Sequence, residues 1–117
     1  MSDSVEIFDK DLTEAARKLI RKHQARDLAL GKPGLFGDPA WDIMLALFVA
    51  GEEDRPFMLS EACTVSTLSP PTVQRYLKVM EMRALVEIKP HETDHQDSYL
   101  ALKPMARVSM TQILALN

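Results

Sequence analysis

The sequence predicts a mainly α-helical protein with one small β-hairpin near its C-terminal end. Three observations support this prediction: apolar residues recur at helical spacing in four blocks, one of which holds two short helices; Gly and Pro separate the blocks; and two short aliphatic runs flank a polar loop. At 117 residues and 46% apolar content, the chain can build one hydrophobic core. We expect an N-terminal helical arm over 1–33, a central domain over 34–104 and a C-terminal helix over 105–117.

Two helices are expected before residue 55. The first begins near Asp11, which can cap the helix while Glu14 reaches back as in a capping box, and it ends at Gly31–Gly34. The second has Asp38 as its cap and Pro39 at its first position, and the residues that follow are apolar almost all round, as in a central core helix. The apolar stripe of the first helix comprises Leu12, Ala15, Ala16, Leu19, Ile20 and His23.

A short helix, a tight turn and a second helix are expected over 60–82. The short helix covers Ser60–Ser66, and the turn falls at Thr67 and Leu68. Ser69 then caps the second helix, because its hydroxyl can accept a hydrogen bond from a first-turn amide. Pro70 suits the first helical position, where its missing amide costs little. This arrangement is a helix-turn-helix.

The second of these helices has two chemically different faces. Val73, Leu77 and Met80, with Tyr76, form an apolar stripe that requires burial. The opposite face carries polar groups suited to phosphates and base edges, which is the division that a recognition helix needs. These groups are Thr72, Gln74, Arg75 and Lys78.

A hairpin and a last helix complete the expected order. An aliphatic strand over Leu85–Ile88, a polar loop over Pro90–Asp97 and a second strand over Tyr99–Leu102 form the hairpin. We expect Arg55–Met58 to supply a short strand that pairs with it. The last helix spans Met105–Leu116.

This layout resembles the MarR-type winged-helix transcription regulators, and the chain looks like a small member of that group. The resemblance covers Gly34–Pro104. It implies a winged helix-turn-helix fold with additional terminal helices and a sequence-specific DNA-binding regulator rather than an enzyme, with no cofactor. The recognition helix, 69–82, would enter the major groove, and the wing, 89–98, would lie alongside. The DNA-binding residues would be Ser69, Pro71, Thr72, Gln74, Arg75, Lys78, Lys89, His95 and Gln96.

The sequence departs from that family pattern in two places, of which the second supports an alternative function. Ala84 stands where the turn after the recognition helix usually carries Gly, so the backbone must avoid positive φ or accept strain. The wing has no Arg, and its Glu92, Asp94 and Asp97 would repel phosphates. The net charge of −3 is also untypical of a nucleic-acid-binding protein. The alternative is therefore a winged helix that acts as a protein–protein interaction module without direct DNA binding.

Assembly is expected through the terminal helices. In MarR-type proteins these helices interleave between two subunits, so the resemblance implies a homodimer; the alternative is that the first helix folds back on its own domain. The basic residues of the first helix are more typical of a solvated face than of phosphate contacts. The dimerisation residues would be Leu12, Ala16, Leu19, Ile20, Val108, Ile113 and Leu114.

The remaining motifs favour simple interpretations. His91–His95 matches the zinc-protease pattern H-E-x-x-H, but that chemistry needs a helix, and the flanking strands predict a loop without a metal. Cys63 is expected to be a small, inert core residue, and a single cysteine suits a reducing cytoplasm. No secretory signal or spanning segment is visible, so no membrane partner is expected. A small-molecule effector is compatible with the resemblance, but no residue pattern specifies one.

Overall fold

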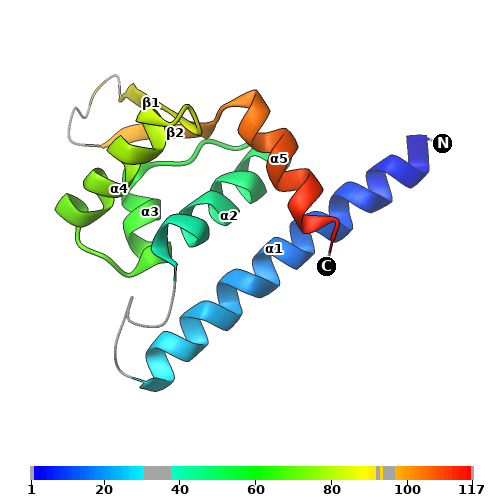
Figure 1. Ribbon diagram of the computed structural model, residues 1–117, viewed down its shortest axis with the longest axis horizontal. Coiled ribbons are helices and arrows are strands. Elements are labelled where there is room, and N and C mark those ends of the chain that lie inside the picture. The colour runs from blue at the N-terminus through cyan, green and yellow to red at the C-terminus, as the bar shows by residue number, and fades with distance from the viewer. Residues whose placement is uncertain (1, 31–37, 92, 94–96, 117) are drawn as a thin grey trace.

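The computed structural model describes residues 2–30, 38–91, 93 and 97–116. Within these ranges it contains helices and one two-stranded antiparallel sheet, so the predicted mainly α fold with a hairpin is confirmed (Figure 1). The elements are α1 (Ser2–Leu30), α2 (Pro39–Glu52), α3 (Leu59–Ser66), α4 (Pro70–Met82), β1 (Val86–Pro90), β2 (Ser98–Leu102) and α5 (Pro104–Leu114).

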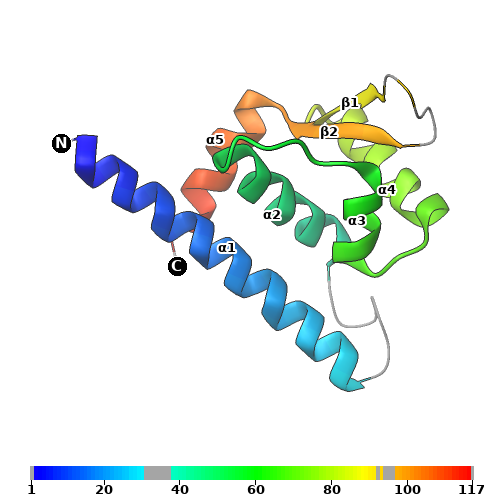
Figure 2. The same cartoon turned by 180° about the vertical axis from the view of Figure 1, so that it is seen from behind.

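Helix α2 forms the centre of the hydrophobic core, as its sequence predicts. Ile43, Leu45 and Phe48 have no exposed surface, and every residue from 42 to 50 is buried. The helix begins as expected, because the side chain of Asp38 accepts a hydrogen bond from the Trp41 amide at 3.2 Å. Helix α1 packs along one side of α2, and the α3–α4 pair lies on the other side (Figures 1 and 2). The core therefore holds the helix-turn-helix at a fixed position relative to α1.

Helix α1 begins earlier than the sequence analysis predicted. It starts at Ser2 and runs continuously through Asp11, so the expected cap at Asp11 is wrong. No Gly or Pro interrupts residues 2–30, and a capping-type residue inside such a segment does not by itself start a helix. The N-terminal turns of α1 extend beyond the body of the protein (Figure 1).

The first helix also folds back on its own domain. Leu12 and Ala16 are buried in the same core as α2. His23 contacts the buried carboxylate of Asp42, and Arg17 forms an ion pair with Glu53 near the other end of α2. Leu12 and Ala16, which the resemblance implied as dimerisation residues, are thus covered within one chain.

The hairpin pairs in one continuous register. Val86 lies opposite Leu102 and Ile88 opposite Leu100, so the strands start and end within two residues of the predicted bounds. The expected additional strand over Arg55–Met58 is reduced to one bridge, between Met58 and Tyr99. The Leu100 amide also donates to the Phe57 carbonyl at 2.8 Å. These contacts join the base of the hairpin to the segment before α3.

Helix α4 ends in a Schellman motif that carries Ala at its left-handed position. The Leu85 amide donates to the Met80 carbonyl at 2.9 Å, and the Ala84 amide donates to the Glu81 carbonyl at 3.0 Å. Ala84 has φ 60°, so the backbone accepts the strain that a Gly would avoid. This turn directs the chain from α4 into β1.

Helix α5 is shorter than predicted and ends at Leu114. It buries Ala106, Met110 and Leu114, which recur every four residues. Val108 and Ile113 are 51% and 44% exposed, and Leu116 is also exposed. Leu114 therefore belongs to the core of its own chain, whereas Val108 and Ile113 form part of an uncovered apolar surface.

None of the helices in the described ranges combines the length and apolar character that crossing a lipid bilayer requires.

Candidate nucleic-acid interface

The turn between α3 and α4 is fixed by local hydrogen bonds. Ser66 is buried and its hydroxyl donates to the Ala62 carbonyl at 2.7 Å. Thr67 follows with φ 59°, and its hydroxyl donates to the Ser66 carbonyl at 2.6 Å. Ala62 and Val73 have no exposed surface, so small side chains allow α3 and α4 to approach closely. The predicted helix-turn-helix is confirmed, with Thr67 in its turn.

The start of α4 differs from the prediction in one respect. Ser69 is the N-cap residue and Pro70 is the first helical residue, but the Ser69 hydroxyl makes no capping hydrogen bond. It instead pairs with the Thr72 hydroxyl at 3.0 Å. Because Pro70 and Pro71 have no amide hydrogen, Thr72 carries the only N–H among the first three residues of α4. The helix start thus offers fewer backbone donors to a phosphate than a helix without Pro in its first turn.

The two faces of α4 are separated largely as predicted. Val73, Leu77 and Met80 are buried, and Gln74, Arg75 and Lys78 are exposed. Tyr76, which was placed on the apolar stripe, is 37% exposed because its position lies at the edge of that stripe. Val79 and Met82 are also exposed, although both are apolar.

The polar residues of α4 form two groups on its exposed side. Ser69, Thr72 and Arg75 are adjacent, because an Nη2 of Arg75 lies 3.5 Å from the Thr72 hydroxyl. Gln74 and Lys78 lie on the side that faces the hairpin, where they line a recess together with residues of β1 and β2. Pro71 is exposed at the start of the helix. The two groups leave α4 with a polar outer face from its first turn to its third.

The cations of α4 are free of carboxylates within the described part of the chain. Neither Arg75 nor Lys78 forms an ion pair there, and both are exposed. Elsewhere, Arg17, Arg55 and Arg107 each lie within ion-pair distance of a glutamate. Unpaired guanidinium and ammonium groups keep their full capacity for an external anion or a base edge. Arg75 and Lys78 are therefore available to an external anion, as are other exposed cations that form no ion pair among the described residues, such as Arg21 and Arg83.

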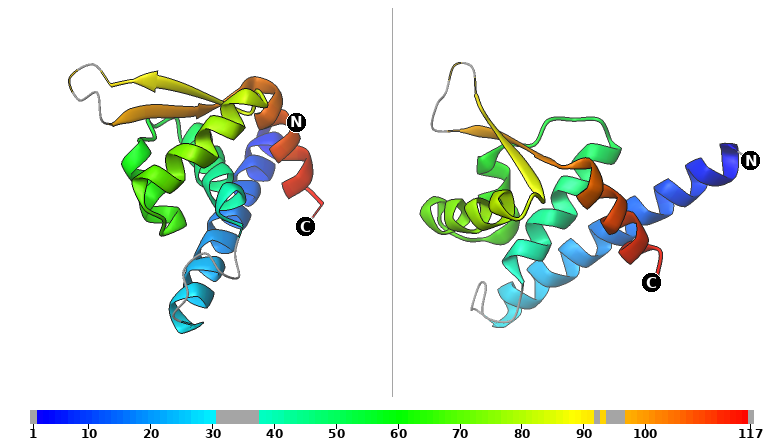
Figure 3. Two further views of the ribbon diagram at one scale, coloured as in Figure 1. Left: turned by 60° about the vertical axis from the view of Figure 1, so that its left-hand side comes forward. Right: turned by 45° about the horizontal axis from the view of Figure 1, so that its top comes forward.

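The hairpin contributes fewer cations. Lys89 on β1 is well exposed and lies 3.9 Å from Glu87, and this distance between exposed groups gives a weak ion pair. The His91 ring stacks on Tyr99 with centroids 5.0 Å apart. His95 and Gln96, together with Glu92 and Asp94, lie outside the described residues. Figure 3 shows β1, which includes Lys89, and β2 extending from the body beside α3 and α4.

The histidine motif does not have helical geometry at its start. His91 comes directly after β1, and its Nδ1 accepts a hydrogen bond from the Thr93 amide at 3.1 Å. The segment connects two paired strands rather than two turns of a helix. The paired-histidine arrangement of a zinc protease requires one helical face.

Cys63 on α3 is half-buried and has a raised pKa. Burial of the thiol is the largest cause, and the negative charge of Asp97 adds to it. A raised pKa lowers the fraction of thiolate at neutral pH, and the thiolate is the reactive form.

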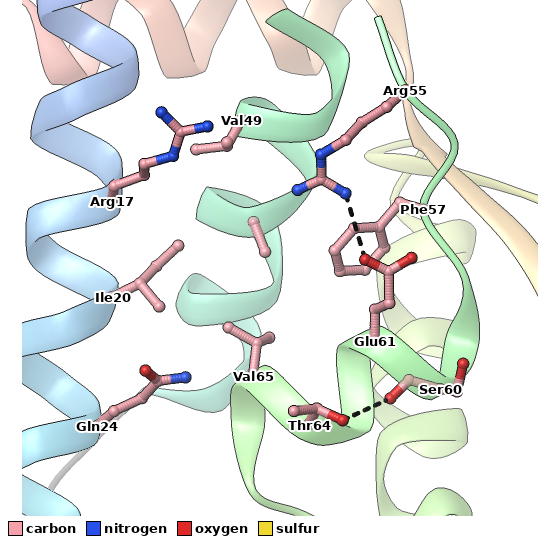
Figure 4. A pocket seen from close by; sticks show the side chains of 11 residues that line it. Arg17, Ile20, Gln24, Val49, Arg55, Phe57, Ser60, Glu61, Thr64 and Val65 are labelled. Atoms are coloured by element: carbon pink, nitrogen blue, oxygen red, sulfur yellow. Dashed lines mark hydrogen bonds and ion pairs between the residues drawn. The ribbon is translucent and has the colours of Figure 1, made fainter. Parts of the chain in front are cut away.

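A pocket of about 370 Å³ lies between residues 17–24 of α1 and the helices α2 and α3 (Figure 4). Ile20, Val49 and Val65 provide apolar walls, and Arg17 lies at its edge. On the opposite side, an Nη1 of Arg55 lies 3.3 Å from a carboxylate oxygen of Glu61. This pocket is open to solvent and combines apolar walls with paired charges at its rim, a composition also found in small-molecule sites.

Comparisons with known proteins identify the fold. No family model matches the sequence, and no curated protein matches it either. Among solved structures, heme-free PefR has a TM-score of 0.58 at 16% identity, covering 97% of this chain and 91% of PefR. A mutant MarR from E. coli complexed with operator DNA has a TM-score of 0.55 at 13% identity, covering 95% of this chain and 65% of that chain. AbsC, a MarR family transcriptional regulator from Streptomyces coelicolor, has a TM-score of 0.55 at 17% identity, covering 88% and 65%.

The chain spans about two thirds of the length of these MarR and AbsC structures. At such low identities the similarity establishes the architecture, whereas the function depends on particular side chains. The chain has the winged helix-turn-helix fold of the MarR regulators.

Proposed function

We propose that this protein is a sequence-specific DNA-binding transcription regulator. The observation that supports the proposal is the exposed face of α4, which carries Gln74, Arg75 and Lys78. Neither cation forms an ion pair within the described residues, and the opposite face of the helix is buried in the core. A helix held in this way can enter the major groove, and these side-chain types form hydrogen bonds with base edges. The similar fold of a MarR complexed with operator DNA supports the same use.

Some of these residues would contact the phosphate backbone and position the protein, and others would contact base edges and recognise the sequence. The hydroxyls of Ser69 and Thr72, with the Thr72 amide and the adjacent Pro71, would lie against the phosphate backbone. Arg75 would reach a guanine, since its guanidinium can bind O6 and N7 together, and Lys78 would contact a base or a phosphate from the side of the wing. Lys89 would add a phosphate contact from β1. These contacts would place α4 in one register on the duplex.

The working form would be a homodimer. The exposed Val108 and Ile113 on α5, together with the half-buried Leu19 on α1, provide apolar surface that one chain does not fully cover, whereas Ile20 faces α2 and α3. A two-fold dimer would present two α4 helices to half-sites about one helical turn, ~10 bp, apart. The proposed interface thus keeps Leu19, Val108 and Ile113 of the expected residues and leaves out Leu12, Ala16, Ile20 and Leu114.

Selection of bound sequences from a pool of random duplexes tests this function. The proposal expects a recovered site with two related halves separated by about 10 bp. Arg75→Ala should lose preference at one base pair of each half-site, at a cost of about 1–3 kcal/mol. Recovery of no sequence preference would contradict the proposal.

A protein-interaction module is the second candidate function. The exposed Val79 and Met82 on α4 favour it, because apolar side chains on an outer helix face suit a protein surface better than a phosphate backbone. The cavity between α1, α2 and α3 adds a place for a small-molecule effector in either case. Binding to duplex DNA that depends on Arg75 and Lys78 would decide for the first function.

A further inference from the structure

The outer part of the wing is bonded to the first helix of the helix-turn-helix. Both oxygens of the Asp97 carboxylate accept hydrogen bonds from Ser60, one from its amide at 3.2 Å and one from its hydroxyl at 3.0 Å. Ser60 is the second residue of α3, and Asp97 directly precedes β2. The contact therefore joins segments that are 37 residues apart in the sequence.

The contact compensates for a missing local cap. The N-cap position of α3 is occupied by Met58, whose side chain has no oxygen that can accept from the first-turn amides. Glu61 satisfies the Met58 amide at 3.2 Å, and Asp97 satisfies the Ser60 amide. A carboxylate is also electrostatically favoured at a helix N-terminus. The wing thus supplies the cap that α3 cannot supply for itself.

The other attachments of the hairpin lie nearer the body. Val86 and Leu100 are buried in the core, and the Leu100 amide bonds to the Phe57 carbonyl. Asp97 lies farther out along the hairpin, next to the Pro90–Ser98 pair at the loop end of the register. Lys89 is one residue from that end. An anchor at Asp97 therefore restrains the part of the wing that carries Lys89.

From this geometry we infer that Asp97 is a positioning residue for DNA binding: its bonds to Ser60 hold the wing at the angle at which Lys89 and α4 meet one duplex together. The inference rests on the proposed function. Asp97 itself would make no favourable DNA contact, because a carboxylate repels phosphates.

Whether Asp97→Ala strengthens or weakens DNA binding distinguishes a positioning role from a purely electrostatic one. Removing a carboxylate from a DNA-facing segment should strengthen binding if only its charge matters. If Asp97 positions the wing, Asp97→Ala should weaken binding by up to about fivefold, because binding must then order the wing without the ~1 kcal/mol that the cap supplies in the free protein. Glu87→Ala is the matched control: it removes an exposed carboxylate from the same hairpin without cutting the anchor, and it should bind equally or more tightly.

A double-mutant cycle then tests the mechanism. In the unmodified protein, Lys89→Ala should weaken binding; in the Asp97→Ala protein it should add little, because the released wing no longer brings Lys89 to the phosphate. Asp97→Asn, which keeps one acceptor, should recover part of the loss. Thermal melts would establish that each variant is folded at the assay temperature. Tighter binding by Asp97→Ala, or an equal Lys89→Ala effect in both backgrounds, would overturn the inference.

Hydrogen exchange separates this inference from the proposed function. Asp97→Ala should accelerate exchange of the Ser60 amide and of the β1–β2 amides, whereas Glu87→Ala should not. Absence of duplex binding by the unmodified protein would refute the DNA-binding function, and the exchange result would then decide whether the anchor exists. Unchanged exchange in Asp97→Ala would overturn the anchor whatever the DNA result.

Discussion

Replacing Ala84 by Gly should stabilise the protein. Ala84 has φ 60° at the left-handed position of the Schellman motif that ends α4. A left-handed conformation costs an L-residue about 1–2 kcal/mol, and Gly avoids that cost. Gly also gives the unfolded chain more freedom, worth about 0.5–1 kcal/mol in the opposite direction. Ala84 is exposed, so its methyl group loses little packing on removal. The expected net gain in the free energy of unfolding is about 0.5–1 kcal/mol.

Chemical denaturation of Ala84→Gly beside Ala101→Gly measures this gain. Ala101 is also exposed, but it occupies an extended position in β2 opposite Glu87, where Gly brings no relief of strain. Ala101→Gly should lower the unfolding free energy by about 0.5–1 kcal/mol, whereas Ala84→Gly should raise it. A decrease in both variants would refute the claim that the turn after α4 is strained.

Three other predictions concern the core, the thiol and the proposed dimer. Phe48→Ala should cost about 3–5 kcal/mol in chemical unfolding because its ring is fully buried in α2, and a loss below about 1 kcal/mol would contradict its central place. Because the pKa of Cys63 is raised, its alkylation at neutral pH should be slower than in the urea-unfolded chain and should become faster as the pH rises. Asp97→Asn should increase the rate, and equal rates in folded and unfolded protein would argue against a raised pKa. Ile113→Glu should convert a homodimer to monomer in sedimentation, whereas Gln112→Glu, with an added negative charge on the same helix, should not; an identical response would locate the interface elsewhere.

Local signals predicted most of the element boundaries. The Asp38–Pro39 and Ser69–Pro70 pairs mark the starts of α2 and α4, because Pro at the first helical position fixes the backbone there. Asp11 failed as a start signal because the residues before it are also compatible with a helix. The absence of Gly and Pro from residues 2–30 was the stronger signal, since helix breakers set boundaries more firmly than capping residues.

The contacts of the candidate site were only partly predictable. The buried and exposed faces of α4 follow from a 3.6-residue period, which requires no knowledge of the rest of the fold. The Ser60–Asp97 contact depends on how the hairpin returns to α3, and no local pattern encodes that distance. For the same reason, Leu12 and Ala16 could be assigned to a dimer or to the core of one chain from sequence alone, and packing against α2 decided their place.

A titration of fluorescent duplex DNA at low and moderate salt, with matched charge variants, tests the central claim that α4 binds DNA. Arg75→Ala/Lys78→Ala removes two positive charges from α4, and Lys18→Ala/Lys22→Ala removes two from exposed positions of α1. We predict salt-sensitive binding that the α4 variant loses and the α1 variant retains. Equal losses of binding in both variants would mean that net charge, and not α4 in particular, determines the affinity. No binding at low salt would contradict the DNA-binding function itself.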